Sequence, residues 1–134
     1  MQLVDTNVLS ELMRQQPDPG VLGWLQGRQQ LSPRLTVSVI TIDEIAFGLT
    51  RRPSVRLQDW FDSFLQRHNV LPITTNIARR AGELRAQLQV KGQVRTQADM
   101  LIAATAQLHG LAVVTRNLRD FEGCGIAVLN PFSV

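Results

Sequence analysis

The sequence lacks cysteine pairs, long apolar runs and a recognisable signal peptide, which are features of secreted and membrane proteins. Its one cysteine, Cys124, excludes an internal disulfide, and disulfides are rare in the cytosol. No apolar run approaches the roughly 20 residues of a membrane-spanning helix, and the longest, such as LIAATA at 101–106, have the size of core segments. No basic segment followed by an apolar one opens the sequence, so we expect no signal peptide. These absences predict a cytoplasmic protein without a membrane partner.

Lysine is almost absent as well, because Lys91 is the only lysine among fourteen basic residues. The guanidinium fork of arginine suits phosphate, so a nucleic-acid partner is compatible with this composition. Biased codon use would give the same excess, and on this feature alone we favour that simpler explanation. With 134 residues, 44% of them hydrophobic, the chain is predicted to be one domain, 1–134, with a core of its own.

Short apolar runs alternate with helical patterns. Five runs are too continuously apolar for surface strands and are predicted to be buried parallel strands: residues 2–4, 35–39, 70–73, 111–115 and 126–130. Before the fourth run, Ile77, Ala81, Leu84 and Leu88 form one apolar stripe at helical spacing. The alternation predicts an α/β fold, a three-layer αβα sandwich around a central parallel sheet of about five strands.

Proline and glycine mark the predicted ends of the helices. Residues 17–20 separate the first two helices, residues 52–53 separate the middle pair, and Gly110 fits a C-terminal cap. Two further helices have an apolar stripe, made of Ile42, Ile45, Ala46 and Leu49 in one and of Leu57, Trp60, Phe61, Phe64 and Leu65 in the other. For the aromatic residues, burial in the domain's own core is favoured over an interface with a partner.

Polar residues follow the predicted strands at the edge where parallel sheets bind ligands. Asp5 follows the first strand, and Thr115 ends the fourth, with Asn117 close behind it. Glu44 lies in the helix entered from the second strand, and Asp99 lies near the start of the helix before the fourth. Parallel strands end at a common edge, so several of these side chains can meet there.

Each acid also has an ordinary structural explanation. Asp5 or Thr6 can cap the following helix, which is worth about 1 kcal/mol. Glu44 can be a first-turn acid favoured by the helix dipole, as its neighbour Asp43 is. Asp99 can complete a capping box with the threonine three residues earlier. These explanations are sufficient for the acids one by one, and only their joint placement favours a functional site.

A divalent cation would explain why a protein keeps several acids together. Like charges held within a few ångströms repel each other, and burial raises the cost further. The available ligands are oxygens, because neither histidine has a ligand-like partner and the cysteine is solitary, so zinc is not expected. Mg²⁺ or Mn²⁺ matches this donor set of oxygens.

Three segments resemble a known family over nearly the whole chain. They are LVDTNVLSEL at 3–12, TIDEIAFGL at 41–49, and ADMLIAATAQLHGLAVVTRNLRDFEGCGIAVLNPF at 98–132. In this order they resemble the PIN-domain family, above all the VapC toxins and their FitB-like relatives from bacterial toxin–antitoxin pairs. The region 51–95 has little family signature. The resemblance implies a metal-dependent endoribonuclease that hydrolyses RNA phosphodiester bonds to 5′-phosphate and 3′-hydroxyl products.

The resemblance also implies roles for individual residues. The three family carboxylates correspond to Asp5, Glu44 and Asp99, and the supporting polar residues to Thr6, Asn7 and Thr115. Many relatives have aspartate where this chain has Asn117, which otherwise fits a loop with an Asx-turn. Either Asn117 or Asp120 could replace that fourth acid. Arg116 is a candidate for binding flanking phosphates.

The same resemblance implies partners. A ribonuclease of this kind is expected to have a cognate antitoxin, a small VapB-like DNA-binding protein, and to form a homodimer and larger toxin–antitoxin assemblies. The alternative is a non-catalytic nucleic-acid-binding protein that acts with its antitoxin on operator DNA. A phosphatase with an aspartate nucleophile is disfavoured, because the second acid of the D-x-D pattern is here Asn7. No G-x-x-x-x-G-K-[ST] motif is present, which excludes a P-loop NTPase.

Overall fold

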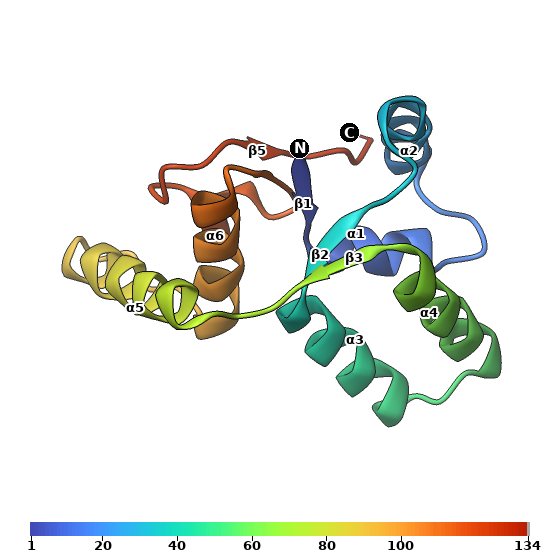
Figure 1. Cartoon of the computed structure of the whole chain (residues 1–134), viewed down its shortest axis with the longest axis horizontal. Helices are drawn as coiled ribbons and strands as arrows, with labels where there is room; N and C mark the ends of the chain where they lie inside the picture. Colours follow the sequence, from blue (N-terminus) through green and yellow to red (C-terminus); the bar gives the residue numbers. More distant parts are fainter. Residues whose placement is uncertain (134) are drawn as a thin grey trace.

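Short parallel strands form the centre of the structure, with helices on both sides (Figure 1). This computed structural model describes residues 1–133. The strands are β1 (Gln2–Val4), β2 (Thr36–Ser38), β3 (Asn69–Leu71), β4 (Ala112–Val114) and β5 (Val128–Leu129). The helices are α1 (Thr6–Leu12), α2 (Pro19–Leu31), α3 (Val39–Arg51), α4 (Val55–Arg67), α5 (Thr75–Val90) and α6 (Gln97–His109), followed by the 3₁₀ helix η1 (Leu118–Phe121).

All five predicted strands are present and every pair is parallel, but they are divided between two sheets. One sheet has the order β1-β4-β5, and the other pairs β2 with β3. β1 and β2 lie in contact without joining one ladder. Strands of two or three residues form few ladder hydrogen bonds, so a slight divergence ends the pairing. The α/β class is confirmed, and the expected single sheet of about five strands is corrected to one sheet of three and one of two.

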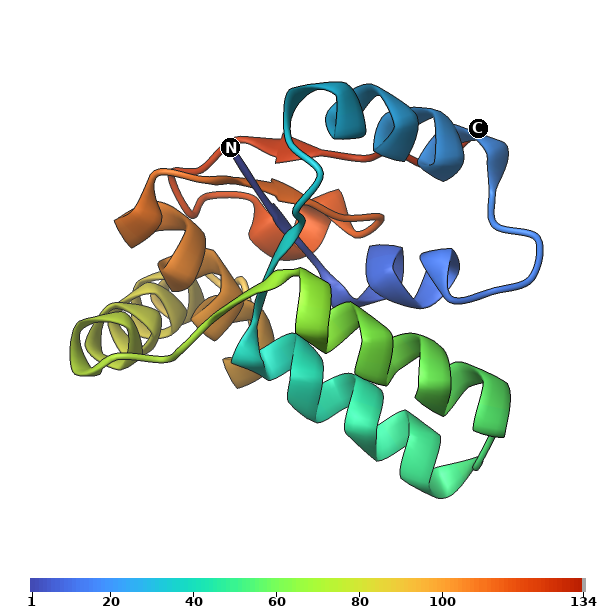
Figure 2. The same cartoon turned by 45° about the vertical axis from the view of Figure 1, so that its right-hand side comes forward.

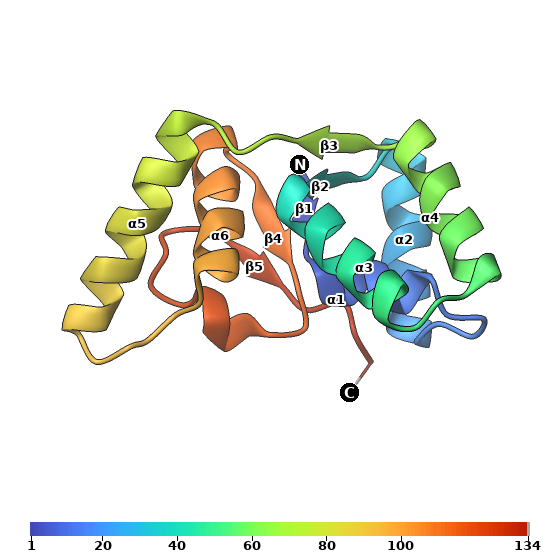
Figure 3. The same cartoon turned by 90° about the horizontal axis from the view of Figure 1, so that it is seen from below.

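Alternation along the strands separates two hydrophobic cores. Leu3 of β1 and Val113 of β4 face one core, which is completed by α5 and α6. The next residues, Val4 and Val114, face the other core, which is built with α1, α3 and α4. Successive side chains of a strand point to opposite faces. Figure 3 shows the strands between α5 and α6 on one side and α1 to α4 on the other, the expected three layers.

Capping residues begin and end the helices where the sequence predicted. Asp18 caps α2 and Pro19 occupies its first position, which separates α2 from α1. At α6, the Thr96 hydroxyl accepts a hydrogen bond of 3.1 Å from the Asp99 N–H. Gly110 ends α6 with a φ of +66°, a left-handed conformation that glycine adopts without strain. Local chemistry therefore fixes the element boundaries near the predicted site.

Helices α3 and α4 extend away from the strands (Figure 2), and together with α1 they line a groove of about 590 Å³. On α4, Phe61 and Phe64 are buried and Trp60 is half-buried, so the prediction that these aromatics belong to the core is confirmed. On α3, Ala46 is exposed, contrary to the prediction. The buried line of this helix follows every fourth residue, Thr41, Ile45 and Leu49, and leaves Ala46 outside it. Within residues 1–133, no helix is long and apolar enough to cross a membrane.

Two glycine-to-alanine substitutions should change stability in opposite directions. Gly110→Ala places a side chain at φ +66° and should lower the free energy of unfolding by about 1 kcal/mol. Gly82→Ala lies inside α5 with no atom within 4 Å of the new Cβ, and should raise it by about 1 kcal/mol. Urea unfolding measures both. Equal effects of the same sign would contradict the assignment of Gly110 as a cap.

Candidate active site

Asp5 is fixed at the carboxyl end of β1 by hydrogen bonds to both carboxylate oxygens. Its Oδ1 accepts a hydrogen bond of 2.8 Å from the Thr6 N–H, so Asp5 is the N-cap of α1. Its Oδ2 accepts 2.8 Å from the Thr115 hydroxyl and 3.2 Å from the Asn7 amide. The Asp5 N–H donates 2.9 Å to the Val114 carbonyl of β4. The side chain is buried, so its orientation is set by the protein and not by solvent.

Thr115 and Asn7 join the ends of β1 and β4. The Thr115 hydroxyl accepts 3.2 Å from the Asn7 amide and 3.0 Å from the Asn117 N–H. The Asn7 side-chain oxygen accepts 3.0 Å from the Arg116 N–H. The expected Asx-turn at Asn117 is therefore replaced by a turn that the threonine hydroxyl makes. These contacts cross more than 100 positions of sequence, and they lock the loop after β4 onto the start of α1.

Glu44 is connected to the same edge through Thr6. The Thr6 hydroxyl donates 2.6 Å to Glu44 Oε1 and lies 3.0 Å from the Thr41 hydroxyl. Thr41 is completely buried, one helical turn before Glu44. The sequence analysis missed Thr41. Its position three residues before Glu44 could have indicated it, because residues three apart are neighbours on the surface of a helix. Glu44 itself is exposed.

The carboxylates are close enough for their charges to act on one another. Burial raises the pKa of Asp99 to about 6, against the lowering effect of a hydrogen bond with the Thr96 side chain. The charges of Asp5, Asp120 and Glu44 raise it further. The raised pKa of Asp99 therefore results from burial combined with the negative charges of neighbouring carboxylates.

Asp5 experiences the same two effects in a more enclosed position. Burial raises its pKa above the ordinary value, and the hydrogen bonds from Thr115 and Thr6 oppose that shift. The charges of Glu44 and Asp120 again act to raise the pKa. The retained hydrogen bonds favour the ionised form, while the neighbouring charges oppose it. An added positive charge would relieve this conflict.

The acidic edge, defined as Asp5, Glu44, Asp99 and Asp120, unites the residue that directly follows β1 with residues of α3, α6 and η1. Of the two candidates for the fourth acid, Asp120 contributes charge to this edge, whereas Asn117 is exposed and contacts Thr115 through its backbone. Within residues 1–133, no three histidine, cysteine, aspartate or glutamate side chains form a ready-made metal-binding group. The donor chemistry, all oxygen and mutually repulsive, fits a hard divalent cation.

The sequence as a whole matches a known family. The PIN-domain family matches residues 3–123, nearly the full length of the chain. The chain therefore belongs to the PIN-domain family, as its motifs predicted.

Relatives within that family are similar from end to end. VapC ribonuclease Y4jK of Sinorhizobium fredii is 37% identical over 98% of each chain. Toxin FitB of Neisseria gonorrhoeae is 30% identical over 98% of this chain and 99% of its own. Among solved structures, the DNA-bound VapBC of Salmonella typhimurium is 31% identical and superimposes with a TM-score of 0.80, covering 98% of this chain and 99% of that one.

The raised pKa of Asp99 makes stability depend on pH in a defined direction. The folded state holds this proton more tightly than the unfolded chain, so the stabilisation is complete below the ordinary pKa of 3.8 and is lost as the pH rises to about 6. In EDTA, the free energy of unfolding of Asp99→Asn should therefore rise relative to that of the wild type across this window. The difference should reach about 1 kcal/mol once the partial exposure of Asp99 is discounted. Thermal unfolding at several pH values measures the difference.

Asp59→Asn, on the exposed face of α4, is the control and should give a difference that is flat over the same window. A flat difference for Asp99→Asn as well would contradict the crowding described above.

Proposed function

We propose that this protein is a metal-dependent endoribonuclease and the toxin of a toxin–antitoxin pair. The observation that carries the proposal is the acidic edge, where burial, together with the charges of carboxylates from distant segments, raises the pKa values of Asp5 and Asp99. The sequence identity of 37% to VapC ribonuclease Y4jK supports RNA as the substrate. The similarity to toxin FitB supports the toxin role, which would be exerted in the cytoplasm, where RNA is found.

Asp5, Glu44 and Asp99 would hold Mg²⁺ or Mn²⁺ at this edge, as the donor set suggests. When bound, the cation lowers the pKa of a water molecule and offsets negative charge that develops on the phosphate. Arg116 would bind a phosphate of the same RNA strand through its guanidinium.

The protein's own groups orient this chemistry. The Thr115 and Thr6 hydrogen bonds keep the Asp5 carboxylate in one orientation. The Thr6 hydroxyl does the same for Glu44. A carboxylate of the acidic edge accepts the proton that the attacking water releases, and Asp120 supplies the fourth negative charge. Groups fixed before the substrate arrives need not reorganise during the reaction.

A companion inhibitor and an oligomer belong to the same proposal. We infer a cognate VapB-like antitoxin that holds the ribonuclease inactive, a homodimer of this chain, and a larger assembly of the two proteins. The similarity to a VapBC complex supports this inference.

The second candidate is a nucleic-acid-binding protein without catalysis, which acts with its antitoxin on operator DNA. The DNA-bound state of the similar VapBC of Salmonella typhimurium favours it. The two candidates are separated by the purified chain alone, because only the enzyme cleaves RNA when a divalent metal is added.

Neutralising the acidic edge should abolish cleavage. Asp5→Asn, Glu44→Gln and Asp99→Asn should each lower kcat at least about 100-fold on a labelled RNA with Mn²⁺ or Mg²⁺, because each removes a cation ligand and its charge. Asp43→Asn is the matched control: it removes the neighbouring charge on α3 and should stay within about twofold of the wild type. EDTA should stop the wild type.

An Asp99→Asn protein that is folded and cleaves as fast as the wild type would refute the proposed mechanism. A wild type that binds RNA and cleaves none with any divalent metal would favour the second candidate.

The fourth acid can be identified by a pair of substitutions. Asp120→Asn should lower kcat about 10-fold, because the charge of Asp120 acts on Asp5 and Asp99. Asn117→Ala should cost less than about threefold, because its contact with Thr115 is made by the backbone. Single-turnover cleavage rates measure both. The opposite ranking would assign the fourth position to Asn117.

A further inference from the structure

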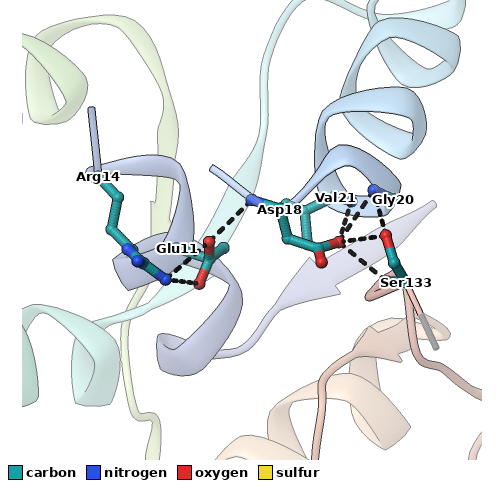
Figure 4. Close-up of polar contacts among 6 residues, drawn as sticks. All are labelled: Glu11, Arg14, Asp18, Gly20, Val21 and Ser133. Carbon is teal, nitrogen blue, oxygen red and sulfur yellow. Dashed lines mark hydrogen bonds and ion pairs between the residues drawn. The ribbon is translucent and has the colours of Figure 1, made fainter. Parts of the chain in front are cut away.

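The strap, defined as residues 130–133, folds back onto the N-terminus of α2 (Figures 1 and 2). Asp18 Oδ2 accepts 2.9 Å from the Ser133 N–H and 3.0 Å from the Ser133 hydroxyl. The same oxygen accepts the cap bonds from the N–H groups of Gly20 and Val21 (Figure 4). Hydrogen bonds from Ser133 and the cap lower the pKa of Asp18, so this carboxylate stays ionised and keeps the strap in place.

The fit between the strap and α2 is close. A Cβ on Gly20 would lie 2.6 Å from the Pro131 carbonyl oxygen and 2.6 Å from the Ser133 nitrogen, so only glycine is accommodated without movement. Behind this contact, the buried Glu11 carboxylate accepts 2.8 Å from the Asp18 N–H and pairs with Arg14 at 3.3 Å (Figure 4). The loop that supports the strap is therefore anchored from inside.

The strap places an aromatic ring under Arg116. The guanidinium carbon of Arg116 lies 4.8 Å from the centre of the Phe132 ring. The backbone of Arg116 is held by Asn7, whose amide also contacts Asp5. An exposed arginine loses side-chain entropy when it is ordered. A ring fixed beforehand reduces that loss at the moment of binding.

Arg116 and Phe132 line a groove of about 430 Å³, with Glu11, Arg14 and the 16–19 loop, which includes Asp18, on its other walls. Within residues 1–133, Arg116 makes no ion pair, whereas Arg14 is paired with Glu11. The two carboxylates of the groove already have partners, because Glu11 pairs with Arg14 and Asp18 accepts the hydrogen bonds from Ser133 and the cap. Arg116 has no carboxylate partner and is held against an aromatic ring, so it is suited to a phosphate.

We propose that the strap holds Arg116 in place to bind one phosphate of the RNA strand beside the cleaved bond, in the groove between Phe132 and Arg14. The inference rests on the proposed function for its substrate. Phe132 is a positioning residue that acts through Arg116, and Asp18 with Ser133 positions Phe132.

Binding and cleavage of a single-stranded RNA test the proposal. In EDTA, where no cleavage occurs, Phe132→Leu and Arg116→Ala should each raise the Kd about 5- to 10-fold. With metal, both should raise KM by a similar factor and leave kcat within about twofold, because the loss is one of substrate binding. Phe132→Tyr keeps the ring and should behave as the wild type. In the Arg116→Ala background, Phe132→Leu should have no further effect.

The matched control is Phe47→Leu, which removes the ring from the other arginine–phenylalanine pair, where Arg51 lies 5.6 Å from Phe47 on the exposed face of α3. It should leave Kd and KM unchanged. A second route to the same loss is Gly20→Ala, which displaces the strap while Phe132 remains. The Arg116 Nε–H signal in NMR reports the geometry directly, since ring stacking shifts it and Phe132→Leu should remove that shift.

Loss of that NMR shift with unchanged Kd and KM would overturn the proposal, and so would equal effects of Phe132→Leu in the wild-type and Arg116→Ala backgrounds. If the wild type binds RNA without cleaving it, and the Phe132→Leu variant binds RNA less tightly than the wild type, the role of the strap is supported and the nuclease is refuted. A wild type that binds no RNA would refute both.

Discussion

The burial of mutually repulsive carboxylates at one edge of the sheet is the constraint on which the rest of this structure depends. Asp99 is raised to a pKa of about 6, and both burial and the charges of its neighbours act in that direction. A protein without a use for such an edge would gain stability by replacing one acid with a neutral residue. A divalent cation bound among these acids would reverse the cost, because the charges that repel each other would then share one partner. The proposed metal chemistry and the instability of the metal-free edge have the same physical origin.

The parallel sheet and the helix caps bring these charges together. β1 and β4 are paired along their whole length, so Asp5 and Thr115 emerge side by side and bond to each other. Asp5 is at once the cap of α1 and a member of the acidic edge. Asp99 donates its backbone N–H to the cap of α6, while the charges of the other acids act on its carboxylate. The capping explanation that the sequence offered for these two residues is therefore true, and it does not exclude the functional role proposed for them.

The sequence predicted the strands and the helix breaks because each depends on local pattern. It placed the acids near one edge because parallel strands end together, and in the structure their charges act on one another. The prediction of a single sheet was wrong. Whether β1 and β2 share a ladder depends on how far the two strands diverge, and the sequence of a three-residue strand does not indicate that. It missed Thr41, whose hydroxyl meets Thr6 from another helix. It also missed the strap: the bonds from Ser133 to Asp18 span 115 positions, and no periodicity signals them. Arg116 was a candidate from its motif, but the ring beneath it is visible only in three dimensions.

The most direct measurement of the central claim is a carbon-13 NMR titration of the Asp99 side chain with and without saturating Mg²⁺. Without the cation, the pKa should lie near 6. With Mg²⁺ bound, the repulsion becomes attraction, and the pKa should fall below the ordinary value of 3.8. An Asp99 that titrates at the same pH in both solutions would contradict the account, because the carboxylates would then share an edge without sharing a cation.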